Sequence, residues 1–292
     1  MERRELIPAP RPGIYDAPME DYLRWDAFGN SDLNNMSRSP AYALDQRTVW
    51  TENTAATTFG IAVHARILEP ERYTTIVGVL PEGLNLRTKD GRAQRDALYQ
   101  SHEVVITKAV ADEVEAAARS VFNHKAASVL VNAPGPVEQS VVVEDPVTGG
   151  LVKVRPDKLI PEKGVVVDVK TTRMTSERAF KRQSFQLGYD RKLSLYLWAM
   201  NQLHDLGFAA PYTTGAILLV QNTAPYEPLV VVYKQRVLDA AAISWRRDLD
   251  RIVECAEANL WPGFTDTVEV LDYEDYMIAA RESGAEEATW EK

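Results

Sequence analysis

The sequence predicts an α/β fold, with a central mixed β-sheet flanked by helices. Apolar patterns follow one another in the order helices, three strands, helix, two strands, helix, which is typical of layers packed around one sheet. Hydrophobic residues make up 45% of the 292 residues, enough for a sizeable core. No repeat or composition shift marks a boundary, so we expect one domain over residues 13–271, an arm at 1–12 and an acidic tail at 272–292.

Helices predominate before residue 130. Two short helices begin at helix-start signals, and a longer helix with an apolar stripe follows them. Their expected positions are after Asn30-Ser31-Asp32, after Ser39-Pro40 and over residues 55–68. His64 lies in the longest of the three, where a lone histidine is more often structural than functional. Two further helices are predicted at residues 93–99 and 108–124.

Three consecutive strands are predicted in the middle of the chain. They cover residues 138–143, 151–160 and 165–170, and turn residues separate them. The expected arrangement is a three-stranded meander. Glu138 lies at the far end of the first strand, and the spacing alone does not say whether it reaches the other two.

The second turn sets a register. Pro161-Glu162-Lys163-Gly164 has proline and glycine where a tight turn favours them. A turn centred between Glu162 and Lys163 places Asp157 opposite Asp168, with Cβ atoms about 4.5–5.5 Å apart. The alternation of side chains puts Arg155 and Lys170 on the same face as these aspartates. The other face is expected to carry an apolar row of Val154, Ile160, Val165, Val167 and Val169.

Two opposed carboxylates repel each other, so a positive charge must lie between or beside them. A divalent cation with oxygen ligands would fill that place, and Mg²⁺ commonly uses one or two carboxylates plus a substrate phosphate. Lys170, beside the pair, could hold an attacking water. The simpler alternative is a surface patch in which Arg155 and Lys170 neutralise the two aspartates.

After these strands the chain is predicted to be helical over residues 176–203, then to form strands at 215–221 and 229–233 and a long helix at 239–260. A basic segment follows the two aspartates directly. Its cations are Arg173, Arg178, Lys181, Arg182, Arg191 and Lys192. A second basic group lies in a predicted loop at residues 78–92, and its members are Arg87, Lys89 and Arg92. Each group is either solvated or contacts phosphate.

Composition excludes several classes. The formal net charge of −9 argues against a protein that coats nucleic acid, although basic residues can still line one channel. A single cysteine, Cys255, excludes an intrachain disulfide, a four-cysteine zinc site and a cysteine-bound iron–sulfur cluster. No run approaches the roughly 18 apolar residues of a membrane span. The N-terminus lacks the apolar stretch of a signal peptide, so we expect a cytoplasmic protein with no membrane partner.

Taken together, these residues resemble a known family. Arg155-Pro156-Asp157 and Asp168-Val169-Lys170 are similar to the PD-(D/E)XK nuclease motif, with aspartate in the second acidic position. Other segments resemble the RecE-like, exodeoxyribonuclease VIII type exonucleases of phages and prophages in the family's order. They are Gly13-Ile14-Tyr15, Ser31-Asp32-Leu33, Ser39-Pro40, Gly60 with His64 and Leu68-Glu69-Pro70, Glu138, Lys170-Thr171-Thr172, Tyr189 with Tyr196, and Trp261-Pro262-Gly263.

The resemblance implies a PD-(D/E)XK nuclease-like core and a site with two Mg²⁺ or Mn²⁺ ions. Asp157, Asp168 and the Val169 carbonyl would be metal ligands, and Lys170 would position the water. His64 would be a metal ligand or site residue. The resemblance therefore favours a functional role, although a lone helical histidine is more often structural. Glu138 would assist the metal or the water. These roles suit metal-assisted hydrolysis.

The resemblance also implies a substrate and partners. These enzymes degrade linear double-stranded DNA from its ends, 5′ to 3′, and leave 3′ single strands for recombination. They form rings around the duplex, and many act with a single-strand annealing recombinase. Candidate DNA contacts are Arg87, Lys89, Arg92, Arg155, Tyr189, Lys192 and Tyr196. Lys192 departs from the family, which usually has glutamine there; lysine is a point charge that lacks the acceptor of glutamine.

Two alternatives stay open at this point. One is a metal-dependent endonuclease or helicase-associated nuclease, which differs in its action on closed circular DNA. The other is a catalytically inactive protein that binds DNA ends, which the lysine at position 192 leaves possible.

Overall fold

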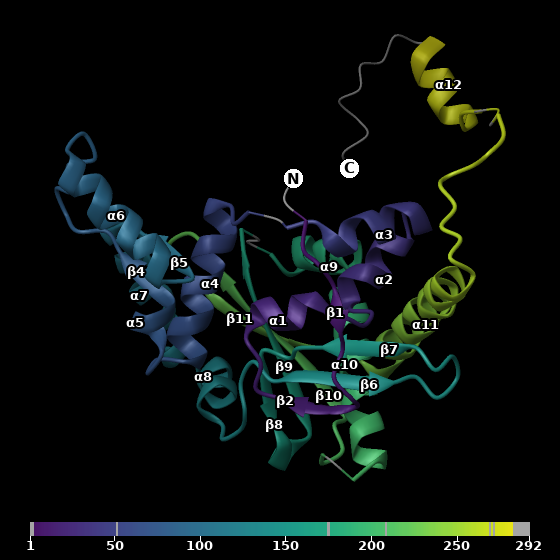
Figure 1. Ribbon diagram of the computed structural model, residues 1–292, viewed down its shortest axis with the longest axis horizontal. Helices are drawn as coiled ribbons and strands as arrows, with labels where there is room; N and C mark the ends of the chain where they lie inside the picture. The colour runs from purple at the N-terminus through teal and green to yellow at the C-terminus, as the bar shows by residue number, and fades with distance from the viewer. Residues whose placement is uncertain are drawn as a thin grey trace.

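A computed structural model of the chain describes residues 3–50, 52–173, 176–207, 209–268, 270 and 272–282. A four-stranded mixed sheet lies at its centre, with helices on both faces (Figure 1). The strands of this sheet are β8 (Lys158–Ile160), β9 (Val165–Thr172), β10 (Thr214–Gln221) and β11 (Pro228–Val232), in the spatial order β11-β10-β9-β8. The predicted α/β fold with a central mixed sheet is therefore confirmed.

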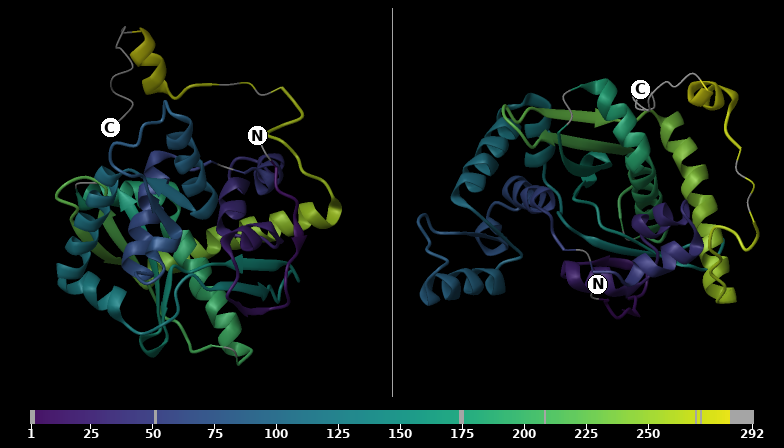
Figure 2. Two further views of the ribbon diagram at one scale, coloured as in Figure 1. Left: turned by 60° about the vertical axis from the view of Figure 1, so that its left-hand side comes forward. Right: turned by 90° about the horizontal axis from the view of Figure 1, so that it is seen from above.

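Helices of two groups cover the sheet, and the main ones are α4 (Ala55–Leu68), α7 (Lys108–Asn123), α8 (Lys125–Asn132), α9 (Glu177–Leu187), α10 (Tyr189–Asp205) and α11 (Gln235–Ala258). On one face, Val166 and Ile217 pack with Leu193 of α10 and Leu249 of α11. On the other face, Val167 and Leu218 pack with Val63 of α4 and Val114 of α7. Seen from above, α4 and α10 lie on opposite sides of the sheet (Figure 2).

The predicted register between the second and third strands is confirmed. Lys158 pairs with Val167 and Ile160 with Val165 in the antiparallel β8–β9 ladder, so Asp157 is next in line opposite Asp168. A one-turn 3₁₀ helix over Pro161–Lys163 makes the connection. Gly164 ends it at φ +59°, where an added Cβ would lie 2.8 Å from the Pro211 carbonyl oxygen, so this turn requires glycine.

The predicted strand over residues 151–160 is wrong in its continuity. The segment forms two strands, because the strand is interrupted at Arg155-Pro156-Asp157. Pro156 has no amide hydrogen to donate to a neighbouring strand. β7 (Leu151–Val154) joins a separate three-stranded sheet with β6 (Ser140–Glu144) and β2 (Gly13–Tyr15). The interruption also changes the environment of Val154. It packs with Val166 and α10 on one face of the sheet, whereas Val167, predicted to share its row, packs on the other face.

Other elements also differ from the sequence prediction. The helix predicted at 93–99 begins earlier, as α6 (Lys89–Ser101), because the Thr88 hydroxyl accepts a hydrogen bond from the Gly91 amide. Helix α8 was not predicted, and its N-cap is the His124 ring. The arm is partly ordered by pairing of β1 (Ile7–Pro8) with β3 (Trp25–Asp26). Residues 275–282 of the predicted tail form α12 (Asp275–Glu282), whereas residues 283–292 lie outside the described part.

The remaining elements are short and lie at the periphery: α1 (Met19–Arg24), α2 (Asn30–Met36), α3 (Pro40–Thr48), α5 (Tyr73–Ile76), β4 (Val77–Val79) and β5 (Val104–Ile106). In the described part of the chain, no helix is both long and apolar enough to cross a membrane.

Candidate active site

Five parts of the chain that are distant in sequence meet around the start of β8 and the middle of β9. Asp157 precedes β8, and Asp168, Val169 and Lys170 lie in β9. Glu138 precedes β6, His64 comes from α4, and Lys192 comes from α10 (Figure 1). Asp157 and Asp168 are thus the centre of a site that receives side chains from helices on both sides of the sheet.

His64 joins two of the acidic residues. Its Nε2 lies 3.2 Å from Asp157 Oδ2, and its Nδ1 lies 3.3 Å from Glu138 Oε1. Burial alone would lower the pKa of His64, but the charges of Asp157 and Glu138 outweigh burial and raise that pKa above its usual value. Each ring nitrogen faces a carboxylate, which favours the protonated imidazole, and a cation bound by the same ligands would compete with that proton.

Gly60 explains how α4 brings His64 so close. An added Cβ at this position would lie 3.1 Å from the Thr171 hydroxyl of β9, so a larger residue would press on the strand. His64 follows one helical turn later on the same side of α4. The Gly60 and His64 pair noted in the sequence therefore combines a close approach of α4 to β9 with a histidine one turn later.

Glu138 is held in an unusual backbone conformation, with φ at +52°. Its amide donates to the Asp157 carbonyl at 3.1 Å, and its Oε2 accepts from Arg155 Nε at 2.8 Å. Burial raises the pKa of the Glu138 carboxyl, although His64 opposes the shift. This backbone pairing settles the register that the sequence spacing left open and places Glu138 beside Asp157.

Asp157 is fixed by the strand that it faces. Its Oδ2 accepts a hydrogen bond from the Val169 amide at 2.6 Å. Burial would raise the pKa of this carboxyl, but His64 and then Lys170 outweigh burial and hold the pKa well below its usual range. Asp157 is therefore ionised and oriented at neutral pH.

Asp168 is almost completely buried, with 1% of its side chain exposed, and is paired with two lysines. Lys170 Nζ lies 2.5 Å from Oδ2, and Lys192 Nζ lies 2.5 Å from Oδ1. Burial lowers the pKa of Lys192, but the charge of Asp168 outweighs it and raises this pKa well above its ordinary value. The Lys170 ammonium also donates to the Val169 carbonyl at 3.0 Å.

The donor atoms fit a divalent cation. One ligand atom each from His64, Glu138 and Asp157 lie within 4.8 Å of one another. Carboxylate oxygens suit Mg²⁺ and Mn²⁺, and the imidazole nitrogen favours a transition metal such as Mn²⁺ over Mg²⁺. The predicted ligands Asp168 and Val169 lie beside this group, but lysine ammonium groups contact both of them.

The predicted DNA contacts lie in two places. Arg87, Lys89 and Arg92 are exposed at the start of α6, in a part of the chain that projects away from the sheet (Figure 2). Tyr189 and Tyr196 lie on α10 beside the site lysines, where Tyr189 is half-buried and Tyr196 is buried. These roles stay predictions.

Arg155 is engaged within the protein. Besides Glu138, its guanidinium donates to the Ala17 carbonyl at 2.8 Å and to the Ser140 hydroxyl at 2.5 Å, and it lies over the Tyr22 ring. Sequence reasoning missed Ser140 and Tyr22. Ser140 could have been found from its position two residues after Glu138, whereas nothing in the sequence points to Tyr22.

The sequence matches a family described as a PDDEXK-like domain of unknown function (DUF3799) over residues 29–274. None of the curated proteins matches the chain.

Among solved structures, the fold is similar to a protein from Eubacterium rectale that is provisionally named an exonuclease. The two share 14% identity with a TM-score of 0.57, over 91% of this chain and 98% of that one. At this identity the likeness shows the fold alone.

Two further structures match with lower scores. A phage-related exonuclease from Haemophilus somnus has 10% identity and a TM-score of 0.31, over 59% of this chain and 85% of its own. An alkaline exonuclease from Laribacter hongkongensis has 10% identity and a TM-score of 0.27, over 69% and 96%.

Proposed function

This chain belongs to the PDDEXK-like domain family DUF3799, and we propose that it is a divalent-metal-dependent exodeoxyribonuclease acting on linear double-stranded DNA. The observation that carries the proposal is the meeting of His64, Glu138 and Asp157 with ligand atoms within 4.8 Å of one another, next to Asp168 and Lys170. A surface patch of two aspartates neutralised by Arg155 and Lys170 would not require the histidine from α4 or a nearly inaccessible Asp168.

Each side chain has a role in hydrolysis of a phosphodiester bond. His64, Glu138 and Asp157 would hold one cation, and Asp168 with the Val169 carbonyl would contribute to a second. Bound divalent cations activate water and stabilise the leaving oxygen. Lys170 would hold the attacking water beside the scissile phosphate. Arg155 fixes the Glu138 carboxylate through a 2.8 Å hydrogen bond, so it acts as a positioning residue.

The finer features of the proposal rest on the resemblance of the sequence to RecE-like exonucleases. They are 5′ to 3′ degradation that leaves 3′ single strands, two ions per site, a homo-oligomeric ring, an annealing recombinase as partner, and a cytoplasmic phage or prophage protein. We propose that residues 13–271 form the nuclease domain. Exposed cations of α9, such as Arg178 and Lys181, follow the site in the chain and would contact phosphates without reading sequence.

The first test compares variants on linear duplex DNA with Mn²⁺ or Mg²⁺. Lys170→Ala is expected to lower the cleavage rate by about 10²–10⁴-fold, the range for a group that assists proton transfer. Asp168→Ala is expected to abolish detectable cleavage. Lys108→Ala, at an exposed lysine of α7 paired with Asp112, is the matched control and should cleave normally. Undiminished metal-dependent degradation by both site variants would refute the mechanism.

One observation favours a second candidate function. Both Asp168 oxygens are paired with lysines, which would also be the arrangement of a protein that binds DNA ends without cutting them. Binding of DNA ends with no cleavage at any Mn²⁺ concentration would favour that candidate. Cleavage by the wild type that is lost in Asp168→Ala would exclude it.

A further inference from the structure

Each carboxylate oxygen of Asp168 contacts a lysine ammonium group. Its side chain is 1% exposed, and ammonium groups lie 2.5 Å from each of its two oxygens. Among the described residues, His64, Glu138 and Asp157 have mutually close ligand atoms, and Asp168 is outside that group. The positive charge beside Asp168 comes from lysines of the chain itself.

The two lysines are held differently. Lys170 is two residues from Asp168 on the same strand and also donates to the Val169 carbonyl, so the strand itself keeps it in place. Lys192 reaches Asp168 from α10, across the packing between helix and sheet, and its ammonium lies 5.2 Å from the Tyr196 ring centre. Its side chain is 20% exposed, so its long stem gives it a route toward solvent.

We propose that Lys192 competes with the divalent cation for Asp168. Its ammonium occupies the carboxylate in the metal-free protein and leaves when a cation binds there, so Lys192 sets the metal concentration that the site needs. The released ammonium pairs with a DNA phosphate, which links metal binding to DNA binding. This inference rests on the proposed function, because it assumes that Asp168 is a metal ligand.

The charges explain the direction of the effect. A divalent cation and an ammonium cannot share one buried carboxylate oxygen, because like charges repel strongly where water is scarce. The cation must therefore displace Lys192, and this exchange weakens its apparent affinity. A glutamine at this position carries no net charge and would leave the carboxylate to the metal. A phosphate that accepts the released ammonium would tighten metal binding, and metal would tighten DNA binding by the same factor.

The test measures Mn²⁺ binding to the full chain without DNA, by isothermal titration calorimetry. Lys192→Gln and Lys192→Met remove the charge, Lys192→Arg keeps it, and Lys108→Gln removes an exposed lysine of α7 as a control. The neutral variants are expected to bind Mn²⁺ at least about tenfold more tightly than the wild type. The arginine variant and the control should stay within about threefold of the wild type.

Two accompanying measurements keep the test decisive. The melting temperature without metal shows whether each variant folds, and Mn²⁺ should raise it further in the neutral variants than in the wild type. Adding a phosphorothioate duplex that resists cleavage should tighten Mn²⁺ binding in the wild type and have a smaller effect in Lys192→Gln.

Neutral variants that bind Mn²⁺ no more tightly than the wild type would overturn the proposal, whether or not the wild type cleaves DNA. Equal tightening in Lys192→Arg would overturn it as well, since charge would then not be the cause. Loss of folding in both neutral variants would also contradict it, because a lysine required for the fold cannot be one that leaves Asp168. Failure of the proposed function is a separate result: tighter Mn²⁺ binding with no cleavage by any form of the protein.

Discussion

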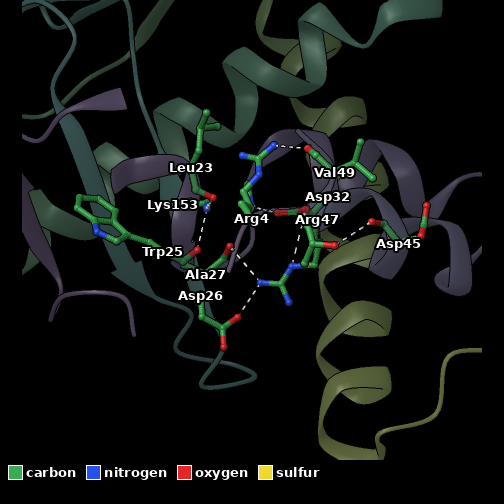
Figure 3. Close-up of polar contacts among 12 residues, drawn as sticks. Arg4, Leu23, Trp25, Asp26, Ala27, Asp32, Asp45, Arg47, Val49 and Lys153 are labelled. Carbon is green, nitrogen blue, oxygen red and sulfur yellow. Dashed lines mark hydrogen bonds and ion pairs between the residues drawn. The ribbon is translucent and has the colours of Figure 1, made fainter. Parts of the chain in front are cut away.

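Two lysines of this protein, the buried Lys153 and the half-buried Lys192, have opposite surroundings. Lys192 pairs with the Asp168 side chain in the site, whereas Lys153 lies in a network at the N-terminal side of the molecule (Figure 3). The Lys153 ammonium donates to three backbone carbonyls, those of Tyr22 at 3.0 Å, Leu23 at 3.2 Å and Trp25 at 2.7 Å. One lysine is thus held by a side chain and the other by the main chain.

The charged neighbours of Lys153 are paired both with the backbone and with one another. In the N-terminal network, the Asp32 carboxylate accepts from the Gly29 amide at 2.7 Å, and the Arg47 guanidinium contacts Asp26 at 2.8 Å and Asp32 at 3.8 Å (Figure 3). In the site, His64 lies between two carboxylates.

The pKa values of the two lysines are shifted in opposite directions. Burial lowers the pKa of Lys153 to about 8, and Asp32 only partly opposes the shift. Burial acts in the same direction on Lys192, but Asp168 reverses it. From this difference we expect Lys153 to contribute to the stability of the fold, whereas Lys192 is the lysine that we propose to exchange for a cation.

Among the variants that compare the site with the N-terminal network, His64→Ala is expected to have the largest effect. Loss of a direct ligand should lower cleavage by more than the roughly 10–100-fold that loss of an outer-shell group costs. Mn²⁺ affinity should fall with it, while the melting temperature without metal stays close to that of the wild type. His204→Ala, at an exposed histidine near the end of α10, is the control and should match the wild type. A normal Mn²⁺ affinity in His64→Ala would show that the histidine is structural.

The N-terminal network should behave in the opposite way. Lys153→Met removes a charged donor from three carbonyls, and hydrogen bonds to charged groups contribute about 1.5–3 kcal/mol each. The free energy of unfolding at pH 7 should fall by only about 2–3 kcal/mol in urea titrations, less than the sum of three such bonds, because the variant no longer buries a charge. Cleavage by the folded variant should stay within about twofold of the wild type. A large loss of cleavage at unchanged stability would contradict the division between the two networks.

The pH dependence of stability tests the Lys153 environment. Between pH 8 and the usual lysine pKa, near 10.4, the unfolded chain holds a proton that the folded chain has released, so stability rises with pH. Relative to Lys153→Met, the wild type should gain about 1.5 kcal/mol between pH 8 and 9.5. A difference between the two proteins that stays flat across this window would mean that Lys153 keeps its proton in the folded state.

The smallest effect is expected at Gly60. In Gly60→Ala the new methyl group would lie 3.1 Å from the Thr171 hydroxyl, so α4 must shift by a few tenths of an ångström. Cleavage should fall roughly tenfold, because small displacements of catalytic groups are costly. The free energy of unfolding should hold or rise by up to about 1 kcal/mol, since alanine favours helices.

The double variant Gly60→Ala, Thr171→Ala removes the contact and should recover most of the activity. If the double variant stays as inactive as Gly60→Ala, the contact with Thr171 is not the cause of the lost activity.

The sequence was most informative where local rules decide the structure. The proline and glycine of one turn fixed the register that brings Asp157 opposite Asp168, and periodicity located α4, α7 and α11. It failed at Pro156, where the chain leaves one sheet for another, because strand propensity does not reveal which sheet a strand joins. It also failed at α6, because Gly91 and the Thr88 cap resemble a loop in sequence.

The site could be predicted in its residues but not in its charges. His64 and Glu138 were singled out only through the resemblance, since no spacing rule links a helix, a left-handed residue and a hairpin. The pairing of Lys192 with Asp168 depends on how α10 packs on β9, which is a tertiary property. The N-terminal network around Lys153 could not be predicted from the sequence, because the partners of this lysine are backbone carbonyls.

The central claim is that this site hydrolyses DNA from its ends with a divalent cation. The most direct measurement is a Mn²⁺ titration on linear duplex labelled at either the 5′ or the 3′ end, alongside closed circular DNA of the same sequence. We expect metal-dependent loss of the linear duplex, early release of the 5′ label as short products, and an intact circle. Nicking or linearisation of the circle at a comparable rate would contradict it, as would the absence of any cleavage across the titration.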